Sequence, residues 1–142
     1  MIKKKICILL NNINEYDFED LLKIYLTKEK FDICVTDKFP TDLQSFDLII
    51  PWSYHKIIRD FKHFNNIVII HSSELPLGRG WAPIYYSIKE GQSDYVISCI
   101  FATDEVDKGD IIIKASFPIL PEYTATFLRK VDREISFLLI KK

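Results

Sequence analysis

Residues 71–110 read HSSELPLGRGWAPIYYSIKEGQSDYVISCIFATDEVDKGD, and they hold all four glycines of the chain and two of its six prolines. Glycine inside a packed element costs stability and needs a local reason. A concentration of this kind predicts a loop whose backbone is shaped for a specific contact. His71 stands at the start of the stretch and directly follows an apolar run at residues 67–70.

The chain before this stretch alternates short apolar runs with helical patterns. Nearly continuous apolar runs of strand length, such as residues 5–10, are typical of strands that are covered on both faces. The expected strands are residues 5–10, 31–36, 47–51 and 67–70, and the expected helices are residues 16–28 and 52–61. Such alternation predicts parallel strands joined by right-handed crossovers.

The chain after the glycines has a different pattern. A helix is expected at residues 82–90, because Pro83 suits a first helical turn and Gly91 a C-terminal stop. Residues 95–102 and 111–117 predict two strands, and their acidic connection is too short for a crossover helix, so they should be antiparallel neighbours. A last helix is expected at residues 122–140, and its apolar stripe consists of Ala125, Leu128, Val131, Ile135 and Leu138 or Leu139.

Together these elements predict a single α/β domain over residues 1–142. Its sheet should be open, mostly parallel and Rossmann-like, with helices on its faces, and it should end in an antiparallel strand pair and a terminal helix. A chain of 142 residues with 48% hydrophobic content is sufficient for one ordinary core.

Composition narrows the function classes. The formal net charge of -1, without a long block of like charge, gives no reason to expect nucleic acid or a membrane as partner. No apolar run is long enough to span a bilayer and no small-residue cleavage site follows the N-terminus, so we expect a cytoplasmic protein. Cys7, Cys34 and Cys99 are odd in number and embedded among Ile, Val and Leu, which predicts buried free thiols and no metal site.

His71 is the first candidate for chemistry. In open α/β sheets ligands bind beyond the carboxyl ends of the strands, and His71 stands at such an end, before Ser72 and Ser73. A lone histidine is more often structural, and an acid such as Asp107 next to Gly109 is more often simple turn chemistry. The functional interpretation therefore needs both residues at one site.

The order of these residues resembles a known family. His71, Leu75-Pro76, Arg79-Gly80 and Ala82-Pro83, followed by the Val106-Asp107-Lys108-Gly109 turn, are similar to the N-terminal domain of the formyl-tetrahydrofolate-dependent formyltransferases. The similarity covers roughly residues 47–119 and keeps the spacing between the two motifs, so chance is a poor explanation.

The resemblance implies an amine that attacks the formyl group carried by the folate. It assigns His71 to the developing oxyanion and Asp107 to the proton that leaves the amine. The family's third catalytic residue is an Asn two positions before the His, and Ile69 stands there in this chain. The implied folate-binding residues are Tyr54, His55, Lys56 and Ile58, with Ala102, Thr103 and Asp104 as the opposite wall. The candidate substrate-binding residues are Ser72, Ser73, Glu74, Arg79 and Gly80.

Two hypotheses of function follow from this resemblance. In the first, the chain transfers a formyl group from formyl-tetrahydrofolate to the amine of a small molecule, for which a nucleotide-linked amino sugar is the preferred candidate. In the second, it is a formyltransferase-fold binding module or subunit that binds folate or nucleotide-sugar without turnover, and Ile69 favours that alternative. A homodimer is plausible because a neighbouring subunit could complete the site.

Overall fold

The structure is a computed structural model of the chain, and it describes residues 2–14, 25–27, 30–56, 58, 65–80 and 82–142. Its elements in chain order are β1 (Lys4–Leu9), β2 (Phe31–Thr36), a 3-10 helix (Leu43–Ser45), β3 (Leu48–Pro51), β4 (Val68–His71), α2 (Pro83–Lys89), β5 (Asp94–Phe101), β6 (Ile111–Pro118) and α3 (Ala125–Lys141). Every strand predicted from the sequence is present within one residue of its expected start.

The first sheet is parallel and has the order β2-β1-β3. Ile6 of β1 pairs with Ile33 on one side and with Leu48 on the other. The last four residues of β1 are all buried, as the continuous apolar run predicts for a central strand.

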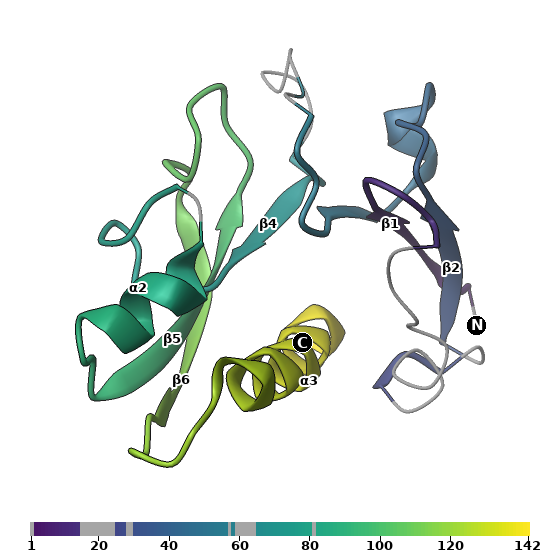
Figure 1. Cartoon of the computed structure of the whole chain (residues 1–142). Coiled ribbons are helices and arrows are strands. Elements are labelled where there is room, and N and C mark those ends of the chain that lie inside the picture. The colour runs from purple at the N-terminus through teal and green to yellow at the C-terminus, as the bar shows by residue number, and fades with distance from the viewer. Residues whose placement is uncertain (1, 15–24, 28–29, 57, 59–64, 81) are drawn as a thin grey trace.

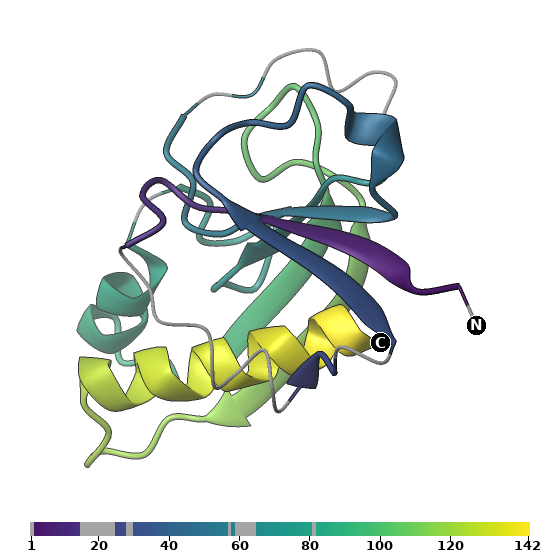
Figure 2. The ribbon, with the colours of Figure 1, turned by 90° about the vertical axis from the view of Figure 1, so that its right-hand side faces the viewer.

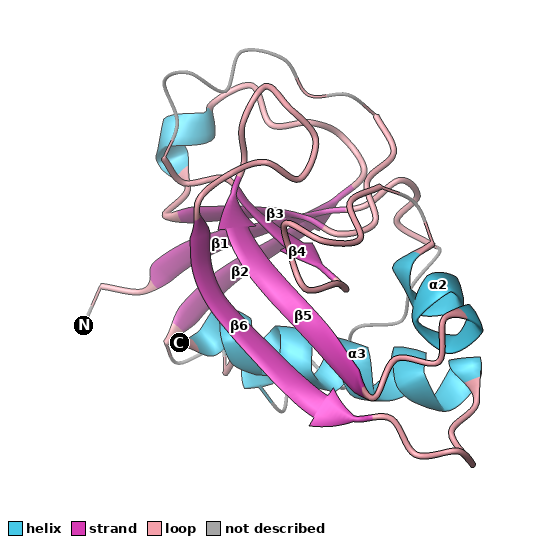
Figure 3. Cartoon of the chain, turned by 90° about the vertical axis from the view of Figure 1, so that its left-hand side faces the viewer, coloured by secondary structure: helices cyan, strands magenta, loops and turns pink. Residues whose placement is uncertain are grey.

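The second sheet is antiparallel and has the order β4-β5-β6. The two sheets meet at one parallel bridge between Ile49 and Ile67, where the Ile49 N–H donates to the Asn66 carbonyl at 2.8 Å. β4 is thus the place where strand direction changes, since it follows β3 in parallel and pairs with β5 in the opposite sense (Figure 3). The expected α/β class, with parallel strands and a C-terminal antiparallel pair, is confirmed.

Helix α3 packs against both sheets (Figures 1 and 2). Phe137 joins the core of the parallel sheet, whereas Leu128 and Leu139 pack with Tyr95 of β5. Of the two alternatives at the end of the predicted stripe, Leu139 is buried and Leu138 is 45% exposed. Thr124 caps the helix by accepting a hydrogen bond from the Phe127 N–H.

The expected helix at residues 52–61 is wrong for the part that the structure describes, because residues 52–56 and 58 form bends and irregular loop. Asn11, at the end of β1, holds this loop. Its amide donates to the Ser53 carbonyl at 2.9 Å and its carbonyl oxygen accepts from the His55 N–H at 2.8 Å. These side-chain bonds replace the backbone bonds of a helical first turn. Residues 57 and 59–61, and most of the expected helix at residues 16–28, lie outside the described residues.

One cysteine prediction is also wrong. Cys7 and Cys99 are buried free thiols as expected, but Cys34 is exposed. The reason is the alternation of β2, in which Asp32 and Cys34 face solvent while Phe31, Ile33 and Val35 are half-buried. Burial raises the pKa of Cys7 to about 12, with a smaller contribution from the adjacent Cys34 thiol.

Within the described ranges, no helix combines the length and the apolar character needed to cross a membrane.

Candidate active site

Alternation along β4 sends neighbouring side chains to opposite faces of the sheet. His71 and Ile69 share one face, whereas Ile70 and Ser72 point to the other, where they line a pocket. The last residues of β4 therefore contribute to two different environments.

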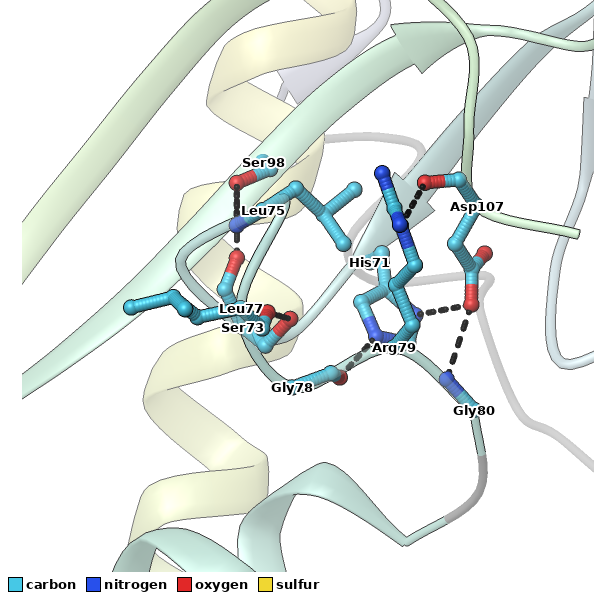
Figure 4. Close-up of polar contacts among 9 residues, drawn as sticks. All are labelled: His71, Ser73, Leu75, Leu77, Gly78, Arg79, Gly80, Ser98 and Asp107. Atoms are coloured by element: carbon cyan, nitrogen blue, oxygen red, sulfur yellow. Dashed lines mark hydrogen bonds and ion pairs between the residues drawn. The ribbon is translucent and has the colours of Figure 1, made fainter.

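On the first face, His71 meets Asp107 (Figure 4). Its Nε2 lies 2.9 Å from the Gly78 carbonyl oxygen, and its Nδ1 lies 3.6 Å from Oδ2 of Asp107. Because a carbonyl can only accept, Nε2 must carry the hydrogen in this arrangement. The two side chains are only 11% and 10% exposed, so the pair is nearly closed off from solvent.

The loop at residues 72–80, called the glycine loop below, also holds Asp107. The Gly80 N–H donates to Oδ2 of Asp107 at 3.1 Å, and Nε of Arg79 donates to its backbone carbonyl at 3.2 Å. Asp107 has φ 55, in the left-handed region that Asp tolerates better than most residues. Gly109 lets this turn close, because a Cβ there would lie 1.6 Å from the Phe101 carbonyl oxygen.

The base of the glycine loop is bound to β5 and β6. Oγ of Ser98 donates to the Ser73 carbonyl at 2.6 Å and accepts from the Leu75 N–H at 3.2 Å. Nζ of Lys114 donates to the Leu75 carbonyl at 2.7 Å. Near the tip, Gly78 has φ 67 and an added Cβ would lie 2.9 Å from the Ser73 Cβ, so only glycine fits this close return.

On the second face of β4 lies a pocket of about 480 Å³, called the α3 pocket. Its walls are the loop after β3, the end of β4, the start of α2 and one stripe of α3. The four lining residues of α3 follow helical spacing and are Arg129, Asp132, Arg133 and Ser136. A helix normally turns apolar residues toward a sheet, so this stripe gives the pocket an unusually polar wall.

Asp132 is the most extensively hydrogen-bonded residue described in the α3 pocket. It is only 9% exposed, and it accepts hydrogen bonds from the hydroxyls of Ser72, Tyr95 and Ser136. Burial, and then the neighbouring Asp132 carboxylate, raise the pKa of the Tyr95 hydroxyl well above its ordinary value. Three hydroxyl donors compensate the buried charge and tie α3 to both β4 and β5.

The sequence did not single out this stripe, because polar residues at helical spacing are usually on the solvent face. The one sequence feature that could have pointed to these pocket residues is that the polar stripe lies next to the apolar stripe on the same helix. That signal does not say what either stripe faces.

The residues predicted for the site fall into separate groups. His71, Arg79, Gly80 and Asp107 are brought together, and Ser73 anchors the glycine loop. Ser72 instead faces the α3 pocket, which His55 also lines. Glu74 is exposed.

The remaining predicted residues belong to two loops. The Lys56 amine lies 6.0 Å from the ring centre of Tyr54, and Ile58 is half-buried. Ala102 donates its N–H to the Ile67 carbonyl at 2.9 Å, and Oγ1 of Thr103 donates to the Glu105 carbonyl. Asp104 is exposed in the same turn. Their folate-binding roles stay predictions.

In the described part of the chain, no three His, Cys, Asp or Glu side chains lie close enough together to hold a metal ion.

The chain is similar to known proteins in sequence and in structure. A methionyl-tRNA formyltransferase from Fusobacterium nucleatum is 33% identical over 125 residues, which cover 85% of this chain and 39% of the relative. Glycinamide ribonucleotide transformylase 1 from Symbiobacterium toebii has a TM-score of 0.73 at 20% identity, covering 98% of this chain and 84% of that one. A methionyl-tRNA formyltransferase from Clostridium thermocellum has a TM-score of 0.70 at 24% identity, covering 94% and 61%.

The chain thus spans about two fifths of the length of the Fusobacterium relative. The family model described as formyl transferase matches residues 27–136, a range that holds β4, the glycine loop, the Asp107 turn and most of α3. A match over this much of the chain, together with the similarity to the Fusobacterium enzyme, means that the protein belongs to the formyl transferase family.

Proposed function

We propose that this chain transfers a formyl group from formyl-tetrahydrofolate to the amine of a small molecule. Family membership supports the reaction class. The observation that carries the proposal is the approach of His71 to Asp107, with 3.6 Å between Nδ1 and Oδ2. A hydrogen-bond donor next to a carboxylate is the pair that transfer of an acyl group to an amine requires.

The donor set fits a folate-carried formyl group. Formyl-tetrahydrofolate, when bound, supplies the electrophilic formyl carbon. His71 would exchange its bond to the Gly78 carbonyl for a bond from Nε2 to the formyl oxygen, where negative charge develops. Asp107, held by the Gly80 N–H, would accept the proton that the attacking amine loses as the new C–N bond forms, and this proton balances the one that the folate nitrogen gains when its bond to the formyl carbon breaks. The glycine loop must therefore move away from Nε2 when substrates bind.

The α3 pocket supports a small polar acceptor. Ser72 lines the pocket and directly follows His71 in the chain, but the two side chains point to opposite faces, so an acceptor bound in the pocket would pass around the end of β4 to bring its amine to His71. Arg129 and Arg133 suit the phosphates of a nucleotide-linked amino sugar, which is our proposed acceptor. The loop residues Tyr54, His55, Lys56, Ile58, Ala102, Thr103 and Asp104 are the proposed folate contacts.

A second candidate is a binding module without turnover. Two observations favour it: Ile69 occupies the position of the family's third catalytic residue, and Nε2 of His71 is already bound to the protein's own Gly78 carbonyl. Under this alternative the chain binds folate or nucleotide-sugar and leaves both unchanged.

The experiment that separates the candidates incubates the purified chain with formyl-tetrahydrofolate and a panel of amines and follows the release of tetrahydrofolate. Turnover that is lost in His71→Ala supports the enzyme, whereas turnover that survives this change removes the role assigned to His71. Folate binding without turnover supports the binding module.

The variant Ile69→Asn tests whether the missing amide limits turnover, because it returns an amide donor to the face of β4 that carries His71. One such donor is worth about 10²-fold in rate. A gain in Ile69→Asn that is absent from a matched Ile69→Leu, which adds no amide donor, supports the assignment.

A further inference from the structure

Three side chains form one row across the second sheet. His71 of β4 pairs with Ser98 of β5, and Ser98 pairs in turn with Lys114 of β6. Directly opposite residues of antiparallel strands project from the same face, so these three side chains are neighbours. We call them the cross-strand row.

Two members of the row bind the base of the glycine loop. Ser98 is fully buried, and its single hydroxyl both donates to the Ser73 carbonyl and accepts from the Leu75 N–H. Lys114 adds a charge-assisted bond to the Leu75 carbonyl at 2.7 Å. These three bonds fix the loop where it leaves His71.

The far end of the same loop holds the proposed chemistry. Gly78 presents its carbonyl to His71, and Gly80 presents its N–H to Asp107 (Figure 4). Because the loop returns to the sheet within a few residues, a shift at its base moves both glycines. Ser73 transmits such a shift directly, since its hydroxyl donates to the Leu77 carbonyl at 2.9 Å.

We infer that Ser98 and Lys114 are positioning residues, which hold the glycine loop on the sheet so that Gly78 and Gly80 orient His71 and Asp107. Neither side chain touches the reacting atoms. The kinetic consequence of this inference rests on the proposed formyl transfer, whereas its structural consequence at the His71 ring does not.

A purely packing role is a poor account of the two residues. Tyr95 and Ile97 on the same strand are fully buried, so burial on β5 does not depend on bonds to the glycine loop. A fully buried hydroxyl such as that of Ser98 contributes to stability only when it is hydrogen-bonded. Ser98 places both of its bonds on the backbone of one loop. Lys114 is exposed, yet its amine binds a carbonyl of that same loop.

The test replaces each positioning group and reads the His71 ring by two-dimensional NMR of its imidazole nitrogens, without substrate. His71→Asn assigns the signals among the three histidines of the chain. We expect Ser98→Ala and Lys114→Met to shift the His71 ring signals, and Lys114→Arg, which keeps a cationic donor, to restore them. Ser116→Ala, an exposed site on the same β6 strand, is the matched control and should change nothing.

In formyl transfer, the same two variants should lower kcat about tenfold or more with little change in KM, because a misplaced catalytic pair loses orientation. Unchanged His71 signals in folded Ser98→Ala and Lys114→Met protein would overturn the inference. If Ser98→Ala does not fold, Lys114→Met and Lys114→Arg decide. A wild-type chain without turnover contradicts the proposed function, while the ring signals still decide the positioning role.

Discussion

The two faces of β4 differ in how open they are to solvent. On the His71 face, His71 is bonded to the Gly78 carbonyl and Asp107 to the Gly80 N–H, and the side chains of His71 and Asp107 are about one tenth exposed. On the Ser72 face, a pocket opens under α3 and is lined by two arginines. We propose that the His71 face holds the reacting groups and that the pocket on the other face binds the phosphate end of the acceptor, whose amine must then reach His71 around the end of β4.

The largest effect is expected from Asp107→Asn. Asn tolerates the left-handed backbone of this position and can still accept from the Gly80 N–H, so the turn should survive. The amide cannot take a proton from the amine, and general-base catalysis is worth about 10²–10⁴-fold. We expect kcat for formyl transfer to fall by that amount with a small change in the urea midpoint.

Asp110→Asn is the control for this change, since it removes an exposed carboxylate from the same turn. Equal rates in the two variants would mean that Asp107 acts only through the net charge of the turn. The His71 face would then no longer be assigned the general base of the reaction.

The second expected effect is on stability and belongs to the pocket face. Asp132→Asn replaces a buried carboxylate that accepts from three hydroxyls by a neutral amide. Hydrogen bonds to a charged group are stronger than neutral ones, so the free energy of unfolding should fall by about 2 kcal/mol. Urea titration measures it, and Glu134→Gln on the same helix is the control. The His71 ring signals should stay in place, which would confirm that the faces are separate.

How far the sequence predicts this molecule differs between the same two faces. The glycines and prolines predicted a shaped loop after His71, whereas the meeting of His71 with Asp107 was expected only from the resemblance to the formyltransferases. Asp132 had no such signal, because a carboxylate on an amphipathic helix is usually solvated, and only the tertiary contact with Ser72 and Tyr95 buries it. The helix expected after β3 was wrong for a related reason, since Asn11 reaches that loop from a distant part of the chain.

A third prediction concerns pH and sharpens the role of the buried network. The pKa of Tyr95 is raised by burial and by Asp132, so above pH 10 the unfolded chain releases this proton while the folded chain keeps it. Stability should therefore decrease as pH rises above 10, by up to about 1.4 kcal/mol per pH unit from this group. Tyr95→Phe lacks the titrating hydroxyl and should be less stable at neutral pH by about 1 kcal/mol.

The stability difference between wild type and Tyr95→Phe should shrink as pH rises past 10. Chemical denaturation at pH 8, 10 and 11 measures it. A constant difference across that range would mean that Tyr95 ionises in the folded chain, which its full burial next to a carboxylate does not allow.

The smallest expected effect tests the pocket face as a place for the acceptor. Arg129 lines the α3 pocket, is exposed, and is close enough to Tyr95 for its charge to favour ionisation of that hydroxyl. Arg129→Gln should raise KM for an anionic acceptor by about fivefold, the size of a partly solvated charge contact, with kcat unchanged. Lys130→Gln, one residue along on the same helix, should leave KM unchanged. Because salt screens exposed charges, the difference between the two variants should narrow at 1 M salt. A fall in kcat without a change in KM would place Arg129 with the reacting groups and end the division between the two faces of β4.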